Sequence, residues 1–410
     1  MRNTTAGIAV GAAVLLTLGA CSSTEPTPDN DSGAADLTIW ADEIRGEVLQ
    51  PFAEQFGEAN GIHVTVETHA DKLQEDFIAA SQQGEGPDIL VAAHDWIGNL
   101  VQNSTIDPIQ LSDEQIAALN PTAVEAVTYD GQVYGTPYAL ENLALFRNTE
   151  LAPDKPTSVE ELTSTGQRLV TEGKADDILS IEVSDVGNPY NVYPFYASGG
   201  GYLFGTDAEG NYDPTDLGLA RPEAVDAFTR LAELGEAGVL KTSMSADNAI
   251  PMFVDGKTPY LVSGPWAISQ VREAGIDYEV SEIPGFSDGG PATPFIGVQA
   301  FFVAAKGDNK TFATEFVTNF ANTAELATAL YAADPRPPAL TGVFDTVAAD
   351  NPDIANFMAA GEGGYILPSI PAMAAVWDPF GKAEAAVLGG EDPATAVEGA
   401  ATAIQEAIGG

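Results

Sequence analysis

The stretch from Gly86 to Gly98 constrains the fold of this chain more than any other part of the sequence. It opens with a glycine and a proline, continues as an apolar run from Ile89 to Ala93, and ends on His94, Asp95 and Trp96. An apolar run bounded by turn residues is typical of a strand buried in a parallel sheet. Ligands of open α/β sheets bind beyond the carboxyl ends of such strands, so the sequence predicts that Asp95 and Trp96 face a binding crevice.

The residues before this stretch complete a βαβαβ pattern. Residues 37–40 and 62–66 are β-prone, whereas residues 49–56 and 73–80 carry apolar side chains at helical spacing. A strand–helix–strand–helix–strand order requires right-handed crossovers and a mainly parallel sheet. We therefore expect an α/β fold, and 410 residues are enough for at least two domains.

The rest of the chain continues the alternation of strands and helices. Residues 139–146 predict a strand interrupted by Glu141-Asn142, and residues 294–303 predict another strand. Pro222 and Asp392-Pro393 each predict the start of a helix. A buried carboxylate in mid-strand is costly unless it meets a partner or a ligand, so Glu141 is a candidate functional residue.

The charge of the chain restricts its partners. Sixteen basic and 60 acidic residues give a net charge of −44. Nucleic-acid binding requires clustered lysine and arginine, so we expect no nucleic-acid partner. The acidic residues are dispersed, which is typical of an exported soluble surface. His63, His69 and His94 lack the spacing of a metal site, and we expect His94 to support neighbouring residues instead.

The first 21 residues have the pattern of a processing signal. Arg2 precedes an uncharged apolar stretch, residues 6–18, which is too short to span a bilayer comfortably. Leu18 to Cys21 resembles a bacterial lipobox, in which Cys21 is the lipid attachment site; the alternative is an unmodified cysteine in a cleaved signal peptide. Residues 22–35 predict a disordered tether, which would hold the folded part on the outer face of the cytoplasmic membrane.

Six short motifs can be considered together. They are Leu37-Thr38-Ile39-Trp40, Asp71-Lys72-Leu73, Gly86-Pro87-Asp88-Ile89, Ala93-His94-Asp95, Ser263-Gly264-Pro265-Trp266 and Pro368-Ser369-Ile370-Pro371-Ala372-Met373. In order and spacing they resemble the maltose- and maltodextrin-binding proteins of bacterial ABC importers, from about residue 35 to the end of the chain. The lipobox fits this resemblance, because importer receptors of Gram-positive bacteria are commonly lipid-anchored.

The resemblance implies a two-lobed type II periplasmic-binding-protein fold, in which each lobe is a mainly parallel sheet flanked by helices and hinge crossings join the lobes. Carried onto this sequence, lobe 1 holds residues 36–140 and 300–345. Lobe 2 holds residues 141–299 and 346–410. The two lobes would close on an oligosaccharide.

The resemblance also implies which residues contact the ligand. Asp95 and Glu141 match two sugar-binding carboxylates, Tyr190 matches a cleft tyrosine, and Trp266 and Trp377 match stacking tryptophans. An ionised carboxylate accepts hydrogen bonds from sugar hydroxyls, and flat aromatic rings cover the apolar faces of sugar rings. Aromatic residues interleaved with carboxylates are therefore typical of a carbohydrate site.

Five further residues are candidates for the same site. Arg45 stands where the family has a cleft lysine, and Asp42 and Glu43 are nearby polar candidates. Trp40 ends the first predicted strand, and Tyr193 lies close to Tyr190 in the sequence. Trp40 could equally be a packing residue, and packing is the more common role for a tyrosine placed like Tyr193.

Some positions depart from the family pattern. Ala92 stands where the family often has a tryptophan, and Trp96 stands where it has an arginine, so aromatic surface is expected four positions further along. Asp378 and Gly381 replace a tyrosine and an arginine, and Asn188 replaces a glutamate. These changes leave the particular sugar open.

Structural roles compete with these functional ones. Asp95 could cap the helix that follows it. Glu141 could form an ion pair with Arg147, and Trp266 and Trp377 could belong to the core. Each alternative predicts contacts that a structure can reveal.

The function implied by the resemblance is that of a monomeric, lipid-anchored extracellular receptor without cofactor or enzymatic activity. It would capture a maltose- or maltodextrin-like α-glucan and deliver it to the permease subunits and ATPase of an ABC importer. One alternative is the same role for a different oligosaccharide. Another is a secreted carbohydrate-active enzyme with Asp95 and Glu141 as its carboxylate pair. A polyamine receptor would need acidic residues clustered about a slender aromatic box.

Overall fold

The computed structural model describes residues 36–70, 72–208 and 210–409. The predicted signal segment, the lipid attachment site Cys21 and the tether lie outside the described residues. Residues 35–410 belong to one structural unit, and the fold is described for that unit.

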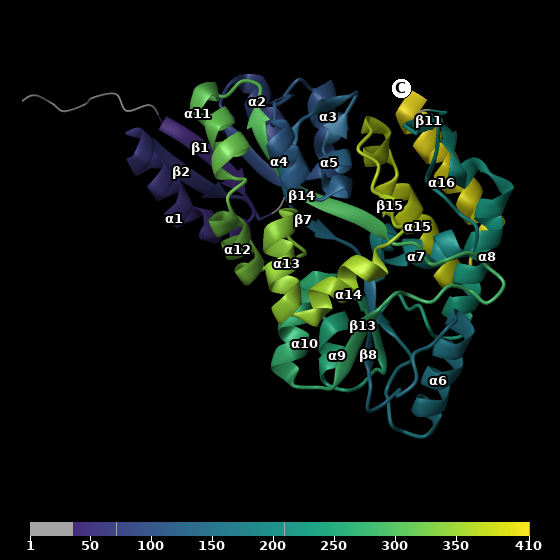
Figure 1. The fold of residues 1–410 in the computed structure, drawn as a ribbon. Coiled ribbons are helices and arrows are strands. Elements are labelled where there is room, and N and C mark those ends of the chain that lie inside the picture. The colour runs from purple at the N-terminus through teal and green to yellow at the C-terminus, as the bar shows by residue number, and fades with distance from the viewer. Residues whose placement is uncertain (1–35, 71, 209, 410) are drawn as a thin grey trace, which may run out of the picture. The chain divides into compact units, whose positions relative to one another are not determined.

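The first sheet has seven strands and contains the predicted βαβαβ unit (Figure 1). β1 (Asp36–Ala41) pairs in parallel with β2 (His63–Thr68) and with β3 (Ile89–Ala93). Helices α1 (Glu43–Asn60) and α2 (Leu73–Gln83) provide the two crossovers. The prediction made from the alternating apolar patterns is confirmed, and Asp95 and Trp96 follow the carboxyl end of β3.

β14 (Phe295–Ala304) makes this sheet mixed. It runs antiparallel to β3, to β4 (Ile106–Asp107) and to β7 (Gly135–Glu141), and parallel to β15 (Tyr365–Ile366). The strand predicted at residues 294–303 is therefore confirmed. The prediction of a mainly parallel sheet is not, because β14 returns against the direction of β3.

The second sheet is also mixed, in the order β13-β8-β12-β9. β8 (Ala144–Asn148) is antiparallel to β12 (Tyr260–Ser263) and β13 (Tyr278–Ser281), and β12 is parallel to β9 (Ser180–Ile181). Only one of its three strand pairings is parallel. The parallel pairing of β9 with β12 requires a long connection, which the segment between them provides.

The single strand predicted at residues 139–146 is two strands in different sheets. β7 ends at Glu141 in the first sheet, and β8 begins at Ala144 in the second. Asn142 lies between them with its amide buried, and its Nδ2 donates to the carbonyl of Leu143. Glu141 therefore stands at the end of a strand, where the chain passes from one sheet to the other.

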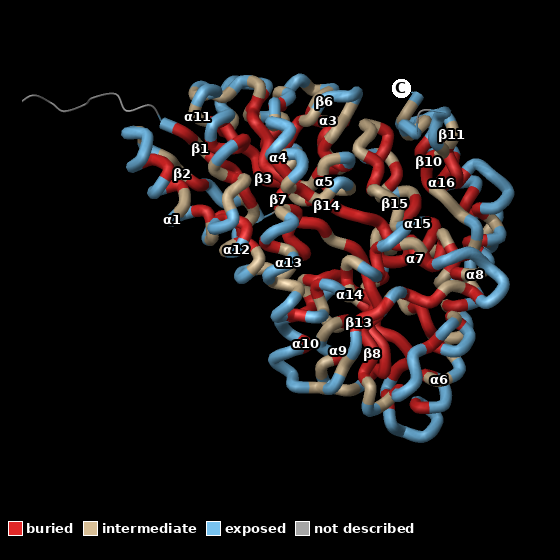
Figure 2. Tube along the Cα trace, viewed as in Figure 1, coloured by how far each residue is buried: buried red, intermediate tan, exposed pale blue. Residues whose placement is uncertain are grey.

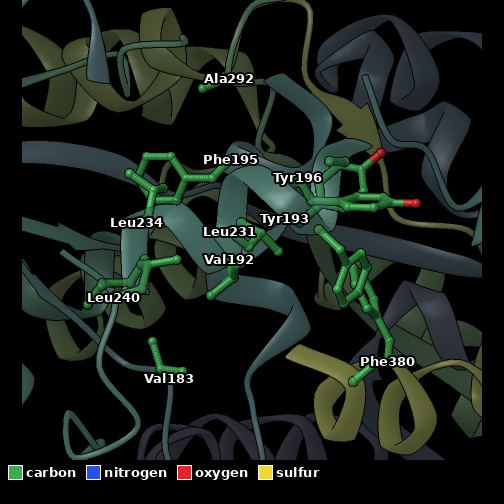
Figure 3. Close-up of a cluster of buried hydrophobic side chains, with 14 of the residues drawn as sticks. Val183, Val192, Tyr193, Phe195, Tyr196, Leu231, Leu234, Leu240, Ala292 and Phe380 are labelled. Atoms are coloured by element: carbon green, nitrogen blue, oxygen red, sulfur yellow. The ribbon is translucent and has the colours of Figure 1, made fainter. Parts of the chain in front are cut away.

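Figure 2 shows the strands as largely buried, whereas the helices have more exposed surface. The largest apolar cluster packs the second sheet against helices such as α7 (Pro189–Ser198) and α8 (Pro222–Glu236). Figure 3 shows part of this cluster, in which Tyr193, Tyr196 and Phe380 lie together. The cluster packs against α7 and so fixes the position of Tyr190, which lies in the first turn of that helix.

The helix starts predicted from proline are confirmed, because α8 begins at Pro222 and α16 (Pro393–Gly409) follows Asp392. Among the described residues, none of the helices is both long and apolar enough to cross a membrane. The remaining helices are α3 (Ile97–Gln102), α4 (Asp113–Ala118), α5 (Pro121–Ala126), α6 (Val159–Thr171), α9 (Ala249–Val254), α10 (Ile268–Ala274), α11 (Lys310–Glu315), α12 (Ala324–Ala333), α13 (Thr341–Asp350), α14 (Pro352–Ala360) and α15 (Trp377–Leu388). Two short strand pairs are β5 (Thr128–Tyr129) with β6 (Gln132–Val133) and β10 (Phe204–Thr206) with β11 (Tyr212–Leu217). The short 3₁₀ turns are η1 (His94–Trp96), η2 (Gly218–Ala220), η3 (Pro265–Ala267) and η5 (Pro371–Ala375). The turn η4 (Phe316–Phe320) is π-helical.

Candidate functional site

The turn η1 follows β3 directly and is anchored by His94. The ring of His94 is fully buried; its Nδ1 accepts from the backbone N–H of Val298 at 3.1 Å, and its Nε2 lies 2.9 Å from the carbonyl of Leu367. These partners require the proton on Nε2, and burial lowers the pKa of His94 to about 4, so the ring is neutral. His94 thus joins β3, β14 and the segment after β15, which fits the supporting role expected of it.

Asp95, Trp96 and Trp377 line one cavity of about 270 Å³. Asp95 and Trp96 come from η1, and Trp377 is the first residue of α15. The other lining residues come from α2, α3 and η5 with the residue before it; they are Gln74, Glu75, Ile78, Asn99, Ile370, Pro371, Met373 and Ala374. The cavity therefore brings together two carboxylates, Asp95 and Glu75, and two tryptophans. Asp95 and both tryptophans are candidates from the sequence, whereas Glu75 is not.

Gly98 allows the two walls of this cavity to come together. A Cβ at Gly98 would lie 2.2 Å from the carbonyl oxygen of Ser369 and 2.7 Å from the Cδ of Pro371. Any side chain at position 98 would push α3 away from η5. The glycine that closes the Gly86–Gly98 stretch is thus required by packing, and it keeps Asp95 close to Trp377.

Asp95 does not cap the helix that follows it. The residue before η1 makes no side-chain cap, and neither does the residue before α3, while Asp95 itself lies inside η1. Burial raises the pKa of Asp95 to about 7, and a hydrogen bond from its own backbone N–H opposes this rise. The helix-capping alternative is therefore wrong, and the carboxyl group is only partly ionised near neutral pH.

Glu141 lies at the end of β7 opposite Gly297 of β14. A Cβ at Gly297 would come within 2.8 Å of the Glu141 Cγ, so the glycine leaves room for the glutamate side chain. Glu141 Oε1 accepts from Gln299 Nε2 at 3.3 Å, and Oε2 pairs with the guanidinium of Arg336. Burial raises the pKa of Glu141 to about 7, against the lowering effects of Arg45 and the Gln299 hydrogen bond.

The ion pair considered between Glu141 and Arg147 is wrong. Arg147 pairs with Glu279 and donates to the carbonyls of Ala152 and Pro153. Arg147 and Glu141 belong to different sheets, and their closeness in sequence does not bring their side chains together. The charged partner of Glu141 is Arg336, 195 residues further along the chain.

Tyr190 and Trp266 form an aromatic pair beside Glu141. Their ring centroids are 6.4 Å apart, and Tyr190 also stacks on Phe295 at 5.9 Å. The buried hydroxyl of Tyr190 has no hydrogen-bond partner among the described residues. The pKa of Tyr190 is raised well above its usual value, first by burial and then by the charges of Glu141 and Asp95. These couplings place the two carboxyl groups and the phenol in one electrostatic neighbourhood.

Trp377 belongs to both the cavity and the core. Its ring meets Phe295 edge-on at 6.3 Å, and the residue is partly buried. Trp266 is likewise partly buried against the same cluster, beneath the guanidinium of Arg336 at 5.7 Å from its ring centroid. The prediction that these two tryptophans could belong to the core is therefore partly correct. Each packs against the core cluster and also has surface outside it.

Four of the candidate residues do not line this cavity. Tyr193 is 2 % exposed and stacks on Phe295 at 3.8 Å, within the cluster drawn in Figure 3. The indole N–H of Trp40 donates to Glu67 at 2.7 Å, and its ring packs on His69. Asp42 caps α1 by accepting from the backbone N–H of Arg45 at 3.0 Å. Glu43 is exposed in the first turn of α1.

Arg45 is buried in a polar network behind Glu141. Its Nε donates to the hydroxyl of Tyr138 at 3.1 Å, and its Nη2 lies 2.6 Å from a carboxylate oxygen of Asp334. Arg45 also pairs with Asp42. Its charge lowers the pKa of Glu141, so Arg45 acts on the site through the electrostatic field rather than through the cavity.

Sequence reasoning missed Arg336 and Gln299. Arg336 lies between prolines that indicate only the end of a helix, and Gln299 lies within an apolar strand. A polar residue in the middle of a buried strand could have drawn attention to Gln299, since such a side chain needs a partner. For Arg336 the sequence carries no comparable signal. Among the described residues, no group of three or more His, Cys, Asp or Glu side chains could hold a metal ion.

Comparison with known proteins identifies the class to which this fold and site belong. Residues 52–356 match the family model of bacterial extracellular solute-binding proteins. The match covers well over half of the chain, and the chain therefore belongs to this family. Its fold is the two-lobed α/β fold of periplasmic binding proteins, as the sequence predicted.

Individual relatives are similar over most of their length. The chain is 28% identical to a maltotriose-binding protein of Pyrococcus abyssi, over 86% of this chain and 77% of the relative. It is 26% identical to a galactooligosaccharide-binding protein of Bacillus subtilis, over 95% of this chain and 94% of the relative. It is 28% identical to a maltooligosaccharide ABC transporter solute-binding lipoprotein of Streptococcus pneumoniae, over 96% of this chain and 94% of the relative.

Proposed function

We propose that this protein is a lipid-anchored extracellular receptor that captures an oligosaccharide between two lobes and delivers it to an ABC importer. The observation that carries the proposal is the cavity at which Asp95, Trp96 and Trp377 meet. A carboxylate can accept two sugar hydroxyls, and two indoles can cover the apolar faces of a sugar ring. The relatives named above supply the ligand class, because all three are named for oligosaccharides.

The binding site has an outer and an inner part. The outer part is the cavity with Asp95, Trp96 and Trp377. The inner part consists of Glu141, Tyr190 and Trp266. The charge of Asp95 raises the pKa of Glu141 and of Tyr190, and Trp266 pairs with Tyr190. The unpartnered hydroxyl of Tyr190 supports a ligand contact there, since a buried phenol without a partner is costly. Arg45 and Asp42 would shape the field around this inner part.

A maltose- or maltodextrin-like α-glucan is the ligand class that we propose. Two of the three relatives are named for maltotriose or maltooligosaccharide, and the third is named for galactooligosaccharide. The departures at Ala92, Trp96 and Asn188 bear on the particular sugar, because each changes a contact expected from the family pattern.

Lobe closure is the proposed route from binding to delivery. Lobe 1 would hold residues 36–140 and 300–345, and lobe 2 residues 141–299 and 346–410. The passage of the chain between the two sheets at Asn142 supports a crossing near residue 141. A ligand that contacts both lobes favours the closed form by its differential affinity for that form.

The proposed location is the outer face of the cytoplasmic membrane, with Cys21 as the lipid attachment site. The lipobox pattern at residues 18–21 and the streptococcal relatives, which are named lipoproteins, support this location. The permease subunits and ATPase of an importer would be its partners, and we propose a monomer. Replacing Cys21 by Ala should release the protein from the membrane fraction, whereas retention of the variant in that fraction would contradict lipid anchoring.

Isothermal titration calorimetry tests the ligand class. The purified protein should bind maltose, maltotriose or a longer maltodextrin with a saturable heat, and Asp95→Asn should weaken that binding. A parallel titration with galactooligosaccharides distinguishes the two sugar families named for the relatives. Heat from galactooligosaccharides alone would change the sugar, and no heat from any oligosaccharide would refute the receptor function.

We propose that the protein is not an enzyme. Residues 285–289 have the Gly-x-Ser-x-Gly pattern, but they lie in the loop between β13 and β14 and not in a strand–turn–helix elbow. Ser287 is exposed there, and its backbone N–H donates to Glu160. Incubation with maltotetraose should leave the sugar intact, and shorter products would instead support hydrolysis by Asp95 and Glu141.

A further inference from the structure

Glu384 is a carboxyl group buried in the second half of α15. The residue is 0 % exposed, and its Oε1 accepts from the backbone N–H of Asn188 at 3.2 Å. Its Oε2 has no hydrogen-bond partner among the described residues. Burial of a polar group without a full set of partners lowers stability, and an apolar side chain would fill the same place without that cost. Packing alone therefore does not account for a glutamate at this position.

The hydrogen bond to Glu384 completes the N-terminal cap of α7. Asn188 is the N-cap residue, and its side chain accepts from the backbone N–H of Asn191 at 3.2 Å. In a capping box, a side chain at the third residue of the same helix accepts from the N-cap N–H. Here the acceptor is Glu384 of α15. The N-terminus of α7 is thus capped in part by another helix.

Two glycines let the two helices touch at the same place. A Cβ at Gly187 would lie 2.0 Å from the carbonyl oxygen of Gly381, and Gly187 has a φ of +68 to +79° typical of the left-handed region, namely +79°. A Cβ at Gly381 would lie 2.7 Å from the carbonyl oxygen of Val186. Gly381 precedes Glu384 by three residues, so both lie on one face of α15. The hydrogen bond therefore fastens α7 to α15 where their backbones are closest.

Each of the two helices carries an aromatic residue of the site in its first turn. Trp377 is the first residue of α15, and Tyr190 is the second residue of α7. Phe295 contacts both, with ring centroids 6.3 Å from Trp377 and 5.9 Å from Tyr190. Further along α7, Tyr196 packs on Phe380 (Figure 3). Glu384 is thus the polar contact at the end of α7 that carries Tyr190.

We propose that Glu384 is a positioning residue of the sugar site, which fastens the N-terminus of α7 to α15 and so sets the spacing between Tyr190 and Trp377. It acts through these two aromatic residues and not by contact with the sugar. This inference rests on the proposed function and deepens it, because an oligosaccharide that reaches both the inner and the outer part must match this spacing. A Tyr190 that is held in place beforehand need not be ordered when the sugar binds.

The test is calorimetry at pH 7 on the wild-type protein, Glu384→Met and Glu384→Gln. The probe is maltotriose, or the galactooligosaccharide of the same length if the wild type binds that series instead. Glu384→Met keeps the length of the side chain but removes the acceptor, and affinity should fall about five- to tenfold, the order of one hydrogen bond. Glu384→Gln keeps an acceptor oxygen on a side chain of the same length, and it should restore affinity to within about twofold of the wild type.

A double-mutant cycle tests whether Glu384 acts through Tyr190. Tyr190→Phe removes the hydroxyl and should weaken binding about fivefold in the wild-type background. In the Glu384→Met background the hydroxyl is no longer held in place, so the same change should weaken binding less than about twofold. A side chain that only contributes stability would leave the effect of Tyr190→Phe unchanged.

Ser198→Ala is the matched control, because Ser198 is also buried and lies at the other end of α7. Its hydroxyl donates to the carbonyl of Gly290 at 2.7 Å and accepts from the backbone N–H of Phe286 at 2.8 Å. Loss of these bonds should lower the melting temperature. The sugar affinity should stay within about twofold of the wild type, since the first turn of α7 keeps its cap.

Hydrogen exchange followed by NMR gives a measurement that needs no variant. In the ligand-free wild type, the amide proton of Asn188 should be protected from exchange by its bond to Glu384. Exchange of this proton at the rate of an unprotected amide would overturn the inference, because the N-terminus of α7 would then not be fastened to α15.

The remaining outcomes separate this inference from the proposed function. Unchanged affinity in a folded Glu384→Met protein, an equal loss in Glu384→Gln, or additive effects in the double-mutant cycle would each overturn the role of Glu384. The receptor function would stand in all three cases, since the wild type still binds the sugar. A wild-type protein that binds neither sugar series would refute the proposed function and this inference with it.

Discussion

Sugar affinity should fall as the pH is lowered from 8 to 6, because Asp95 must be ionised to accept sugar hydroxyls well. Burial raises the pKa of Asp95 to about 7 in the ligand-free protein. Hydrogen bonds donated by a ligand favour the carboxylate over the carboxylic acid, so binding lowers this pKa. Below pH 7 the group must first lose a proton, and the cost of that loss is subtracted from the binding free energy.

The size of the effect follows from the pKa. With a pKa of about 7, the carboxyl group is roughly nine-tenths ionised at pH 8 and one-tenth ionised at pH 6. The dissociation constant should therefore rise about tenfold between these pH values, which corresponds to about 1.4 kcal/mol. Glu141, whose pKa is also raised to about 7, would add to this change for any ligand that reaches it.

Calorimetry at pH 8, 7 and 6 measures both the affinity and the proton released. Titrations in two buffers of different ionisation enthalpy give the number of protons released per ligand bound. At pH 7 Asp95 should account for about half a proton. Asp95→Asn should bind more weakly at pH 8 and lose this share of the pH dependence, while Glu141→Gln is the control that retains it. Affinity that is independent of pH, or that rises as the pH falls, would show that the ligand does not bind the ionised Asp95.

Three further perturbations test other parts of the structure. Trp96→Ala should weaken sugar binding about five- to tenfold in calorimetry, and unchanged affinity would show that Trp96 does not supply the aromatic surface missing at Ala92. Tyr193→Phe should leave the affinity within about twofold, whereas Tyr193→Ala should lower the free energy of unfolding by about 3–5 kcal/mol in denaturant titrations, because the ring is buried against Phe295. Burial raises the pKa of Glu384 to about 8, so this group should lower the free energy of unfolding by up to about 1.4 kcal/mol per pH unit from pH 5 to 8. Calorimetric melting of Glu384→Gln should show a smaller decrease over this range. A decrease identical to that of the wild type would contradict this role of Glu384.

The part of the fold that the sequence could predict is the part determined locally. The βαβαβ unit from β1 to β3 follows from apolar patterns that each span fewer than twenty residues. The same patterns place Asp95 and Trp96 at the end of β3. The direction of β14 could not be predicted in this way, because it depends on pairing with strands about 160 to 210 residues earlier in the chain.

Glu141 shows the same limit for a single side chain. The cost of burying a carboxylate indicated correctly that Glu141 needs a partner. The nearby Arg147 was a candidate by sequence distance, whereas the actual partner, Arg336, is 195 residues away. Residue type thus predicted the need for a partner, and only the three-dimensional fold could supply its identity.

Ala92 and Trp96 explain how the ligand class can persist while the ligand itself changes. Ala92 is 5 % exposed and lies opposite Ala300 in the pairing of β3 with β14, where its small side chain belongs to the core. Trp96 lies four residues further on, at the cavity that also contains Asp95. On the proposed function, the hydroxyl acceptor stays at the end of the strand while the ring that covers the sugar moves along the turn. Sugar hydroxyls and ring faces would remain the recognised chemistry, but the ring would approach from a different direction. On that function we expect linkage and chain length to be the properties that these substitutions change.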